Sequence, residues 1–127
     1  LKGEEAMVFF DAVATGHRGY ATVHADSSLS TIDRLVTLMK RDTNAQSYTD
    51  KYLRKLLSMS VDLVVFMKNF KVHEIAEVLY DEEKDDVTYN QLFRFEVERY
   101  ENGKSIGRFV TLNEPKGRVK EKIELSC

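Results

Sequence analysis

The apolar run Asp62-Leu63-Val64-Val65-Phe66-Met67 marks the point where the sequence pattern changes from helical to extended. Its apolar side chains follow one another without the polar alternation that a half-exposed strand shows. A continuous apolar run is typical of a strand that is covered on both faces, as in a parallel α/β sheet. We therefore expect a buried strand here, helices packed against it, and an α/β fold.

Helices are predicted before this strand, over residues 1–13, about 27–41 and 48–59, because apolar residues recur there at helical spacing. In the middle helix they are Ile32, Leu35, Val36 and Met39. Glycine at position 16 is expected to end the first helix, and Asp26, Ser27 and Ser28 are candidate N-caps for the next. The β-branched and aromatic stretch Tyr20–Ala25 predicts a second, short buried strand.

The residues that follow the apolar run predict a β-rich region and a last helix. Val72–Tyr80 and Phe93–Glu98 have the composition of strands, and the second alternates strictly between apolar and charged residues. Asn102-Gly103 predicts a hairpin turn, with Ile106–Leu112 as the returning strand. Pro115 is expected to begin a basic amphipathic helix.

Length and composition exclude several classes of protein. The chain has 127 residues and a mass of 14.7 kDa, which is the size of one domain. Its net charge of −2 does not indicate a nucleic-acid binding surface. No apolar run approaches the roughly 20 residues of a transmembrane helix. The single cysteine, Cys127, excludes an internal disulfide framework and a cysteine-based zinc cluster.

Sequence motifs for catalysis are weak when they are read one at a time. Gly103-Lys104-Ser105 matches only the end of a phosphate-binding P-loop, because Glu98 stands where the first glycine is required. His17 and His24 lie seven residues apart, which is not the spacing of a helical metal pair, so no metal site is predicted. His24 is either a hydrogen-bonded structural histidine or a ligand-binding one, placed near the end of a predicted strand where α/β proteins bind ligands.

An ordered set of short segments carries a family resemblance. The segments are Lys2-Gly3-Glu4-Glu5-Ala6, Ala14-Thr15-Gly16-His17, Ala21-Thr22-Val23-His24-Ala25 and Asp33-Arg34-Leu35. Together they resemble the C-terminal part of the type II/type IV secretion ATPase superfamily, the motors of type II secretion, type IV pili and Tad/Flp pilus assembly. Thr15–Ala25 resembles the His box of that family, and Lys2–Ala6 is similar to the segment after its Walker B glutamate.

The second half of the chain resembles the Tad/Flp, or CpaF-like, branch of the superfamily. The segments concerned are Ile75–Val78, Gln91–Glu96 and Ile106–Phe109. Arg18, Asp26 and Lys2 depart from the residues that are common in that branch. The resemblance implies the C-terminal half of a RecA-like P-loop ATPase domain over residues 1–70, with helices packed on a buried strand pair. A β-hairpin extension and a C-terminal helix would occupy residues 71–127.

The resemblance also implies roles for individual residues. His24 would sense or orient the γ-phosphate of ATP, and Glu5 would support the Walker B region. His17, with Gly16 and Thr15, would shape the nucleotide side of the site. Arg34 would anchor the following loop or face a subunit boundary, although a surface arginine on an amphipathic helix is an equal reading. ATP and Mg²⁺ are expected in the full-length parent, with none bound to this chain.

The resemblance further implies a hexameric, cytoplasmic parent that works at the inner membrane with a platform protein and without nucleic acid. Because the chain opens at Leu1 and has no P-loop, it is expected to be a C-terminal fragment that is inactive alone. Two alternatives stay open. One is an interaction module that docks through its 87–112 hairpin and its tail helix, and the other is a small α/β domain with structural histidines.

Overall fold

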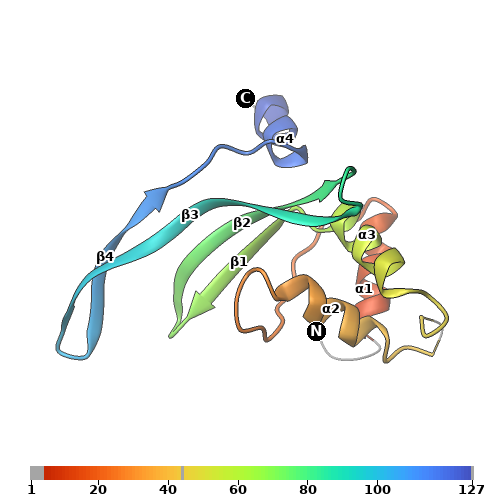
Figure 1. Ribbon diagram of the computed structural model, residues 1–127, viewed down its shortest axis with the longest axis horizontal. Coiled ribbons are helices and arrows are strands. Elements are labelled where there is room, and N and C mark those ends of the chain that lie inside the picture. The colour runs from red at the N-terminus through yellow and green to blue at the C-terminus, as the bar shows by residue number, and fades with distance from the viewer. Residues whose placement is uncertain (1–4, 44, 127) are drawn as a thin grey trace.

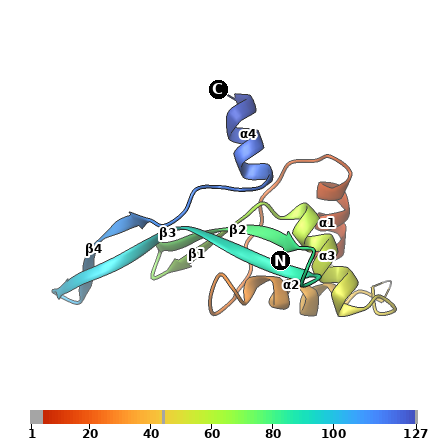
Figure 2. The same cartoon turned by 45° about the horizontal axis from the view of Figure 1, so that its top comes forward.

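The structure is a computed structural model that describes residues 5–43 and 45–126. Helices and strands follow one another along the chain as α1 (Glu5–Ala14), α2 (Thr31–Met39), α3 (Asp50–Ser60), β1 (Leu63–Lys68), β2 (Lys71–Asp81), β3 (Asp86–Glu101), β4 (Lys104–Thr111) and α4 (Arg118–Ser126). Helices α1, α2 and α3 gather at one end of the sheet, and the β3–β4 hairpin extends beyond the other end (Figure 1). In both views α4 lies across the sheet from α2 (Figure 2).

The hydrophobic core lies between the helices and one face of the sheet. Helix α3 begins where the Thr49 side chain accepts a hydrogen bond from the Tyr52 N–H at 3.1 Å. Each fully buried aliphatic side chain contributes about 1.5–3 kcal/mol through removal from water. The core residues of α1, α2, α3 and the sheet include Phe10, Ile32, Leu38, Met39, Leu53, Leu57, Val64, Val78 and Val87.

The sheet is an antiparallel meander in the order β1-β2-β3-β4 among the described residues. Each strand pair contains a register shift, the one between β3 and β4 falling between Val97 and Arg99. Such bulges increase the local twist of a strand. Asn102 and Gly103 have φ values of 49° and 75°, which suits a two-residue hairpin turn, so the predicted hairpin is confirmed.

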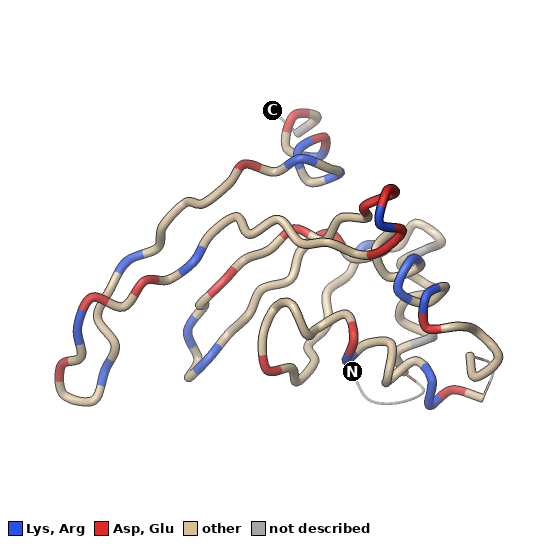
Figure 3. Tube along the Cα trace, viewed as in Figure 1, with Lys and Arg blue, Asp and Glu red and all other residues tan. Residues whose placement is uncertain are grey.

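Strand alternation gives the two faces of the sheet different neighbours. Ala76 and Val78 of β2 are buried, and Val78 belongs to the core beneath the helices. Glu77 lies between them in the strand and points to the opposite face, where it contacts the segment that leads into α4. Acidic residues gather at the turn between β2 and β3 (Figure 3).

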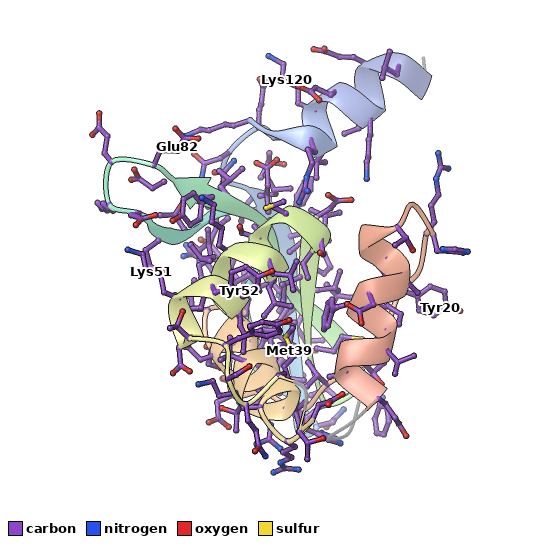
Figure 4. All side chains as sticks on the ribbon, turned by 90° about the vertical axis from the view of Figure 1, so that its right-hand side faces the viewer. Tyr20, Met39, Lys51, Tyr52, Glu82 and Lys120 are labelled. Atoms are coloured by element: carbon purple, nitrogen blue, oxygen red, sulfur yellow. The ribbon has the colours of Figure 1, made fainter. Side chains whose placement is uncertain are left out.

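Two sequence predictions about strands are wrong. Tyr20–Ala25 is irregular, not a buried strand, and Tyr20 is 95% exposed and points away from the body (Figure 4). The apolar run at 63–68 does form β1, but it pairs antiparallel with β2 and keeps one face partly open, so the sheet is not parallel. A mixed α/β fold, the hairpin and a C-terminal helix are confirmed. The RecA-like assignment stays a prediction.

Helix boundaries differ modestly from those expected. Helix α2 begins at Thr31, after a turn of serines, and α4 begins at Arg118, three residues beyond Pro115. Lys2, Gly3 and Glu4 of the first family segment lie outside the described residues. Within the described part of the chain, every helix is too short or too polar to cross a membrane.

Candidate functional site

The C-terminal end of α1 holds three of the predicted site residues, Thr15, Gly16 and His17. Gly16 adopts φ +100°, and its N–H donates to the carbonyl oxygen of Val13 at 3.1 Å. The N–H of His17 donates to the carbonyl oxygen of Ala12 at 3.2 Å. These two bonds form a Schellman motif, which satisfies the last carbonyls of a helix and favours glycine at the position of positive φ.

Polar side chains at this helix end turn back onto carbonyl groups of the last turns of α1. The Thr15 hydroxyl lies 2.9 Å from the carbonyl oxygen of Ala12 and 3.1 Å from that of Asp11. His17 Nδ1 lies 3.1 Å from the carbonyl oxygen of Ala12. A carbonyl can only accept, so this contact is a hydrogen bond in the tautomer that carries a proton on Nδ1.

His24 lies on the irregular connection between α1 and α2, with its side chain exposed. The connection ends at a reciprocal pair of serines. Ser27 N–H donates to Ser30 Oγ and Ser30 N–H donates to Ser27 Oγ, each at 3.1 Å. This pair closes the turn before α2, whose N-cap is Ser30 and not one of the predicted candidates Asp26, Ser27 and Ser28. His24 thus sits on a segment that is anchored at both ends, by the Gly16 cap and by the serine pair.

Glu5 and Arg34 lie apart from the α1 cap. Glu5 is the first residue of α1, so the length of the helix separates it from Thr15 by about 15 Å. Arg34 is exposed on α2. In the described part of the chain, no hydrogen bond or ion pair joins His24, Glu5 or Arg34 to His17. The structure therefore brings Thr15, Gly16 and His17 together and leaves the other three as separate surface groups.

A buried carboxylate on the other side of the sheet was missed by the sequence predictions. Glu77 is 1% exposed, and its Oε1 accepts from Asn90 Nδ2 at 3.1 Å and from the Lys116 N–H at 2.9 Å. Its Oε2 accepts from the Gly117 N–H at 3.0 Å. The sequence signal that could have indicated this site is a glutamate placed between two apolar residues of a predicted strand, Ala76 and Val78. A glutamate that becomes buried in such a strand needs hydrogen-bond partners for its charge.

The hydrogen bonds to Glu77 outweigh the cost of burying its charge. Burial by itself raises the pKa of the carboxyl group because it disfavours the ionised form. The Lys116 N–H, the Asn90 amide, the Gly117 N–H and the positive charge of Lys116 act in the other direction. Together they hold the pKa of Glu77 below its usual value, so the carboxylate stays ionised at neutral pH.

A second polar cluster joins the helices to the sheet through Arg54 of α3. Its guanidinium contacts Asp33 of α2, and its Nε lies 2.9 Å from Asp86 Oδ1 at the start of β3. The hydrogen bond from Arg54 and the N–H of Val87 lower the pKa of Asp86. Burial raises the pKa of the neighbouring Tyr89 hydroxyl. We assign this cluster a structural role, because its charged members are paired with one another.

Comparison with known proteins finds type IV secretion system proteins. The chain is 36% identical to VirB11 of Brucella suis over 87 residues, which is 64% of this chain and 24% of that protein. It is 35% identical to PtlH of Bordetella pertussis over 69 residues, or 54% of this chain and 20% of PtlH. An uncharacterized Methanocaldococcus jannaschii protein, MJ1287, is 32% identical over 104 residues, or 77% of this chain and 36% of its own length.

The chain thus matches about a quarter of the length of the VirB11 proteins to which it is similar. No family model and no solved structure matches it. VirB11 and PtlH are both named as type IV secretion system proteins, whereas the name of MJ1287 states no function. Over part of its length the chain is therefore similar to type IV secretion system proteins.

Proposed function

We propose that the chain is part of an ATP-hydrolysing motor that powers protein secretion or the assembly of a type IV or Tad pilus. The observation that carries the proposal is the similarity to VirB11 and PtlH, at 36% and 35% identity. The anchored segment between α1 and α2 supports it, because it presents His24 on a connection fixed at both ends. The parent would act as a hexamer at the inner membrane, together with a platform protein.

The chain would contribute phosphate contacts to that motor and not a complete nucleotide site. His24 and Arg34 expose hydrogen-bond donors, so both fit a contact with the γ-phosphate of ATP. His17 would shape the adjoining loop from the α1 cap. The described residues contain no group of three His, Cys, Asp or Glu side chains that could hold a metal ion, so we derive no metal-binding role for them. Glu5 would support the site from the start of α1.

The sequence has no P-loop pattern, and phosphoryl transfer depends almost entirely on positioned phosphates and charge stabilisation. We therefore expect the 127-residue chain alone to show no ATP turnover above a mock-purified control. Metal-dependent turnover that co-purifies with the folded chain would contradict this expectation.

The role of His24 is tested in the longer parent protein. Replacing His24 by Ala is expected to lower kcat for ATP hydrolysis roughly tenfold or more, because a donor to transition-state charge is lost, with a smaller effect on KM. His73→Ala is the matched control, since His73 packs edge-on against Phe95 at 5.7 Å and is far along the chain from the His box. Unchanged turnover in His24→Ala would instead favour the structural reading of His24.

A second candidate function is a docking module for a secretion or pilus platform protein. It is favoured by apolar side chains on the β3–β4 hairpin, where Phe109 is 53% and Tyr100 is 74% exposed. In this case Phe109→Ser in the parent would abolish secretion or assembly and leave ATP turnover intact. The His24→Ala and Phe109→Ser variants together distinguish the two functions.

A further inference from the structure

The segment from Glu114 to Ser126, here called the arm, connects to the rest of the fold mainly through polar contacts. It consists of residues 114–117 and helix α4, which stands off the sheet in both views (Figures 1 and 2). Val119 is the buried apolar residue of α4, whereas Ile123 and Leu125 are exposed, the latter to 88%. A helix this short that buries one apolar side chain gains little from hydrophobic contact.

The first polar contact is the Glu77 carboxylate described above. Its two oxygens accept the backbone N–H groups of Lys116 and Gly117, and Asn90 Nδ2 bridges it to the carbonyl oxygen of Glu114 at 2.8 Å. Gly117 fits closely against the sheet, because a Cβ there would lie 2.8 Å from Leu79 Cδ2. A charged acceptor for two backbone donors is among the stronger hydrogen-bonded arrangements in proteins.

The second polar contact lies at the C-terminal end of α3. The Arg118 guanidinium donates to the carbonyl oxygens of Ser58 at 2.8 Å and Val61 at 3.2 Å, and also to that of Met59. It also forms an ion pair with Asp62 at 3.1 Å. A cation at this place satisfies the last carbonyls of α3 and complements the negative end of its dipole.

Water can replace these polar contacts, whereas it cannot replace apolar packing. When the arm leaves, the Glu77 carboxylate and the α3 carbonyls gain water, which replaces the lost hydrogen bonds in part. Val119, the buried apolar residue of α4, does not belong to the hydrophobic core beneath the helices, so opening of the arm removes no residue from that core. The free energy of opening the arm is therefore expected to be lower than that of unfolding the core.

We propose that the arm is a strap that closes on Glu77 and Arg118 and opens as a unit while α1, α2, α3 and the sheet stay folded. Closed, it covers Glu77, Asn90 and the end of α3. Open, it exposes the face of β2 and β3 around Leu79, next to the already exposed side chains Leu63, Val65 and Phe93. The strap thus controls how much apolar sheet surface the molecule presents.

Residue-resolved amide hydrogen exchange on the whole chain tests this proposal. Glu77→Gln keeps the shape of the side chain but turns one acceptor into a donor that faces N–H groups. It is expected to speed exchange in residues 116–126 roughly ten- to hundredfold, as the loss of hydrogen bonds to a charged group implies. Exchange in the buried parts of α3 and β2 should change by less than about twofold. The control is Glu74→Gln on the same strand, whose partner is Gln91 Nε2 at 2.7 Å, with no expected effect on the arm.

A second variant perturbs the packing of the arm against the sheet and leaves every charged group in place. Gly117→Ala adds the methyl group that would meet Leu79, and it should speed exchange in the arm alone. The proposal is overturned if Glu77→Gln leaves exchange in the arm unchanged. It is also overturned if either variant speeds exchange in the arm and in the core of α3 by the same factor, because the arm would then belong to one cooperative unit.

Discussion

At the scale of single residues, Glu77 shows how a buried charge becomes tolerable. Burial in an apolar face would push the carboxyl group toward its neutral form, but two backbone N–H donors and the Asn90 side-chain amide reverse that balance. The donors come from two different places, one strand and one loop. The paired carboxylate thus fixes the loop relative to the strand. Removing the carboxylate leaves the N–H donors unpaired, and removing the donors leaves a buried charge unpaired.

The lowered pKa of Glu77 makes docking of the arm sensitive to acid. A carboxyl group whose folded pKa lies below its unfolded value stabilises the fold above the unfolded pKa, which is about 4.3 for glutamate, and loses that contribution as pH falls through the folded pKa. We expect the arm to be fully docked at pH 7 and to open progressively below about pH 4. The NMR resonance of the Glu77 carboxyl carbon reports protonation of the side chain. Hydrogen exchange of the Lys116 and Gly117 amides, corrected for the pH dependence of the intrinsic exchange rate, reports opening of the arm.

The same titration of Glu77→Gln provides the control. Its arm should open to the same extent at pH 7 and at pH 4, because the variant has no proton to gain at this position. If the wild-type arm were equally insensitive to pH over this range, the hydrogen bonds to Glu77 would not hold the arm in place.

At the scale of elements, the β3–β4 hairpin requires a glycine at position 107. A Cβ at Gly107 would lie 1.9 Å from the carbonyl oxygen of Glu96, a distance that no side chain can occupy. Gly107 pairs with Val97 next to the register shift, where β3 comes unusually close to β4. The hairpin turn itself is set by Asn102 and Gly103, so two separate positions define its shape.

Gly107→Ala is expected to separate the strands at this point and to lower the free energy of unfolding by about 1–3 kcal/mol, as overpacking does. Urea unfolding gives the global value, and cross-strand NMR contacts between residues 96–97 and 107–108 report the local change. Ser105→Ala, on the same strand, should cost less than about 0.5 kcal/mol. Equal stability of the two variants would show that β3 and β4 can separate at Gly107 without cost.

The elements also show which parts of the fold could be predicted from the sequence. The amphipathic patterns of α2 and α3 and the Asn102-Gly103 turn are local signals, and the structure confirms all three. Tyr20–Ala25 has strand propensity but forms no ladder in the described structure, and propensity without a pairing partner does not make a strand. The apolar run of β1 indicates burial but says nothing of direction, so an antiparallel pair was equally compatible.

The candidate site could be predicted only where it is local. Thr15, Gly16 and His17 come together because a helix cap brings neighbours in sequence into contact. His24 and Arg34 have no such link, and their proximity to a nucleotide remains an expectation from the resemblance. The Glu77 cluster joins residues up to 40 positions apart, so only the burial of a glutamate in a strand could have indicated it.

At the scale of the whole molecule, Arg54 connects three elements that are distant in sequence. It extends from α3 to Asp33 of α2 and to Asp86 of β3, and its side chain is 24% exposed. Asp33 and Asp86 are each more than half exposed, so water and salt weaken these pairs. The network therefore joins the helices to the sheet and adds modestly to the stability that the core supplies.

Arg54→Met is expected to lower the free energy of unfolding by about 1–2 kcal/mol at low salt, because the hydrogen bonds are lost while the aliphatic stem is kept. The difference from wild type should shrink as salt is raised. The difference should also shrink as pH falls. Because the folded pKa of Asp86 is lowered, its ionised carboxylate stabilises the fold at pH values above the unfolded aspartate pKa, and this contribution is lost as pH falls through the folded pKa. Urea unfolding across salt and pH measures both trends, with Arg41→Met, an exposed arginine just beyond α2, as the matched control. A loss that is independent of salt and pH would assign the role of Arg54 to packing of its stem.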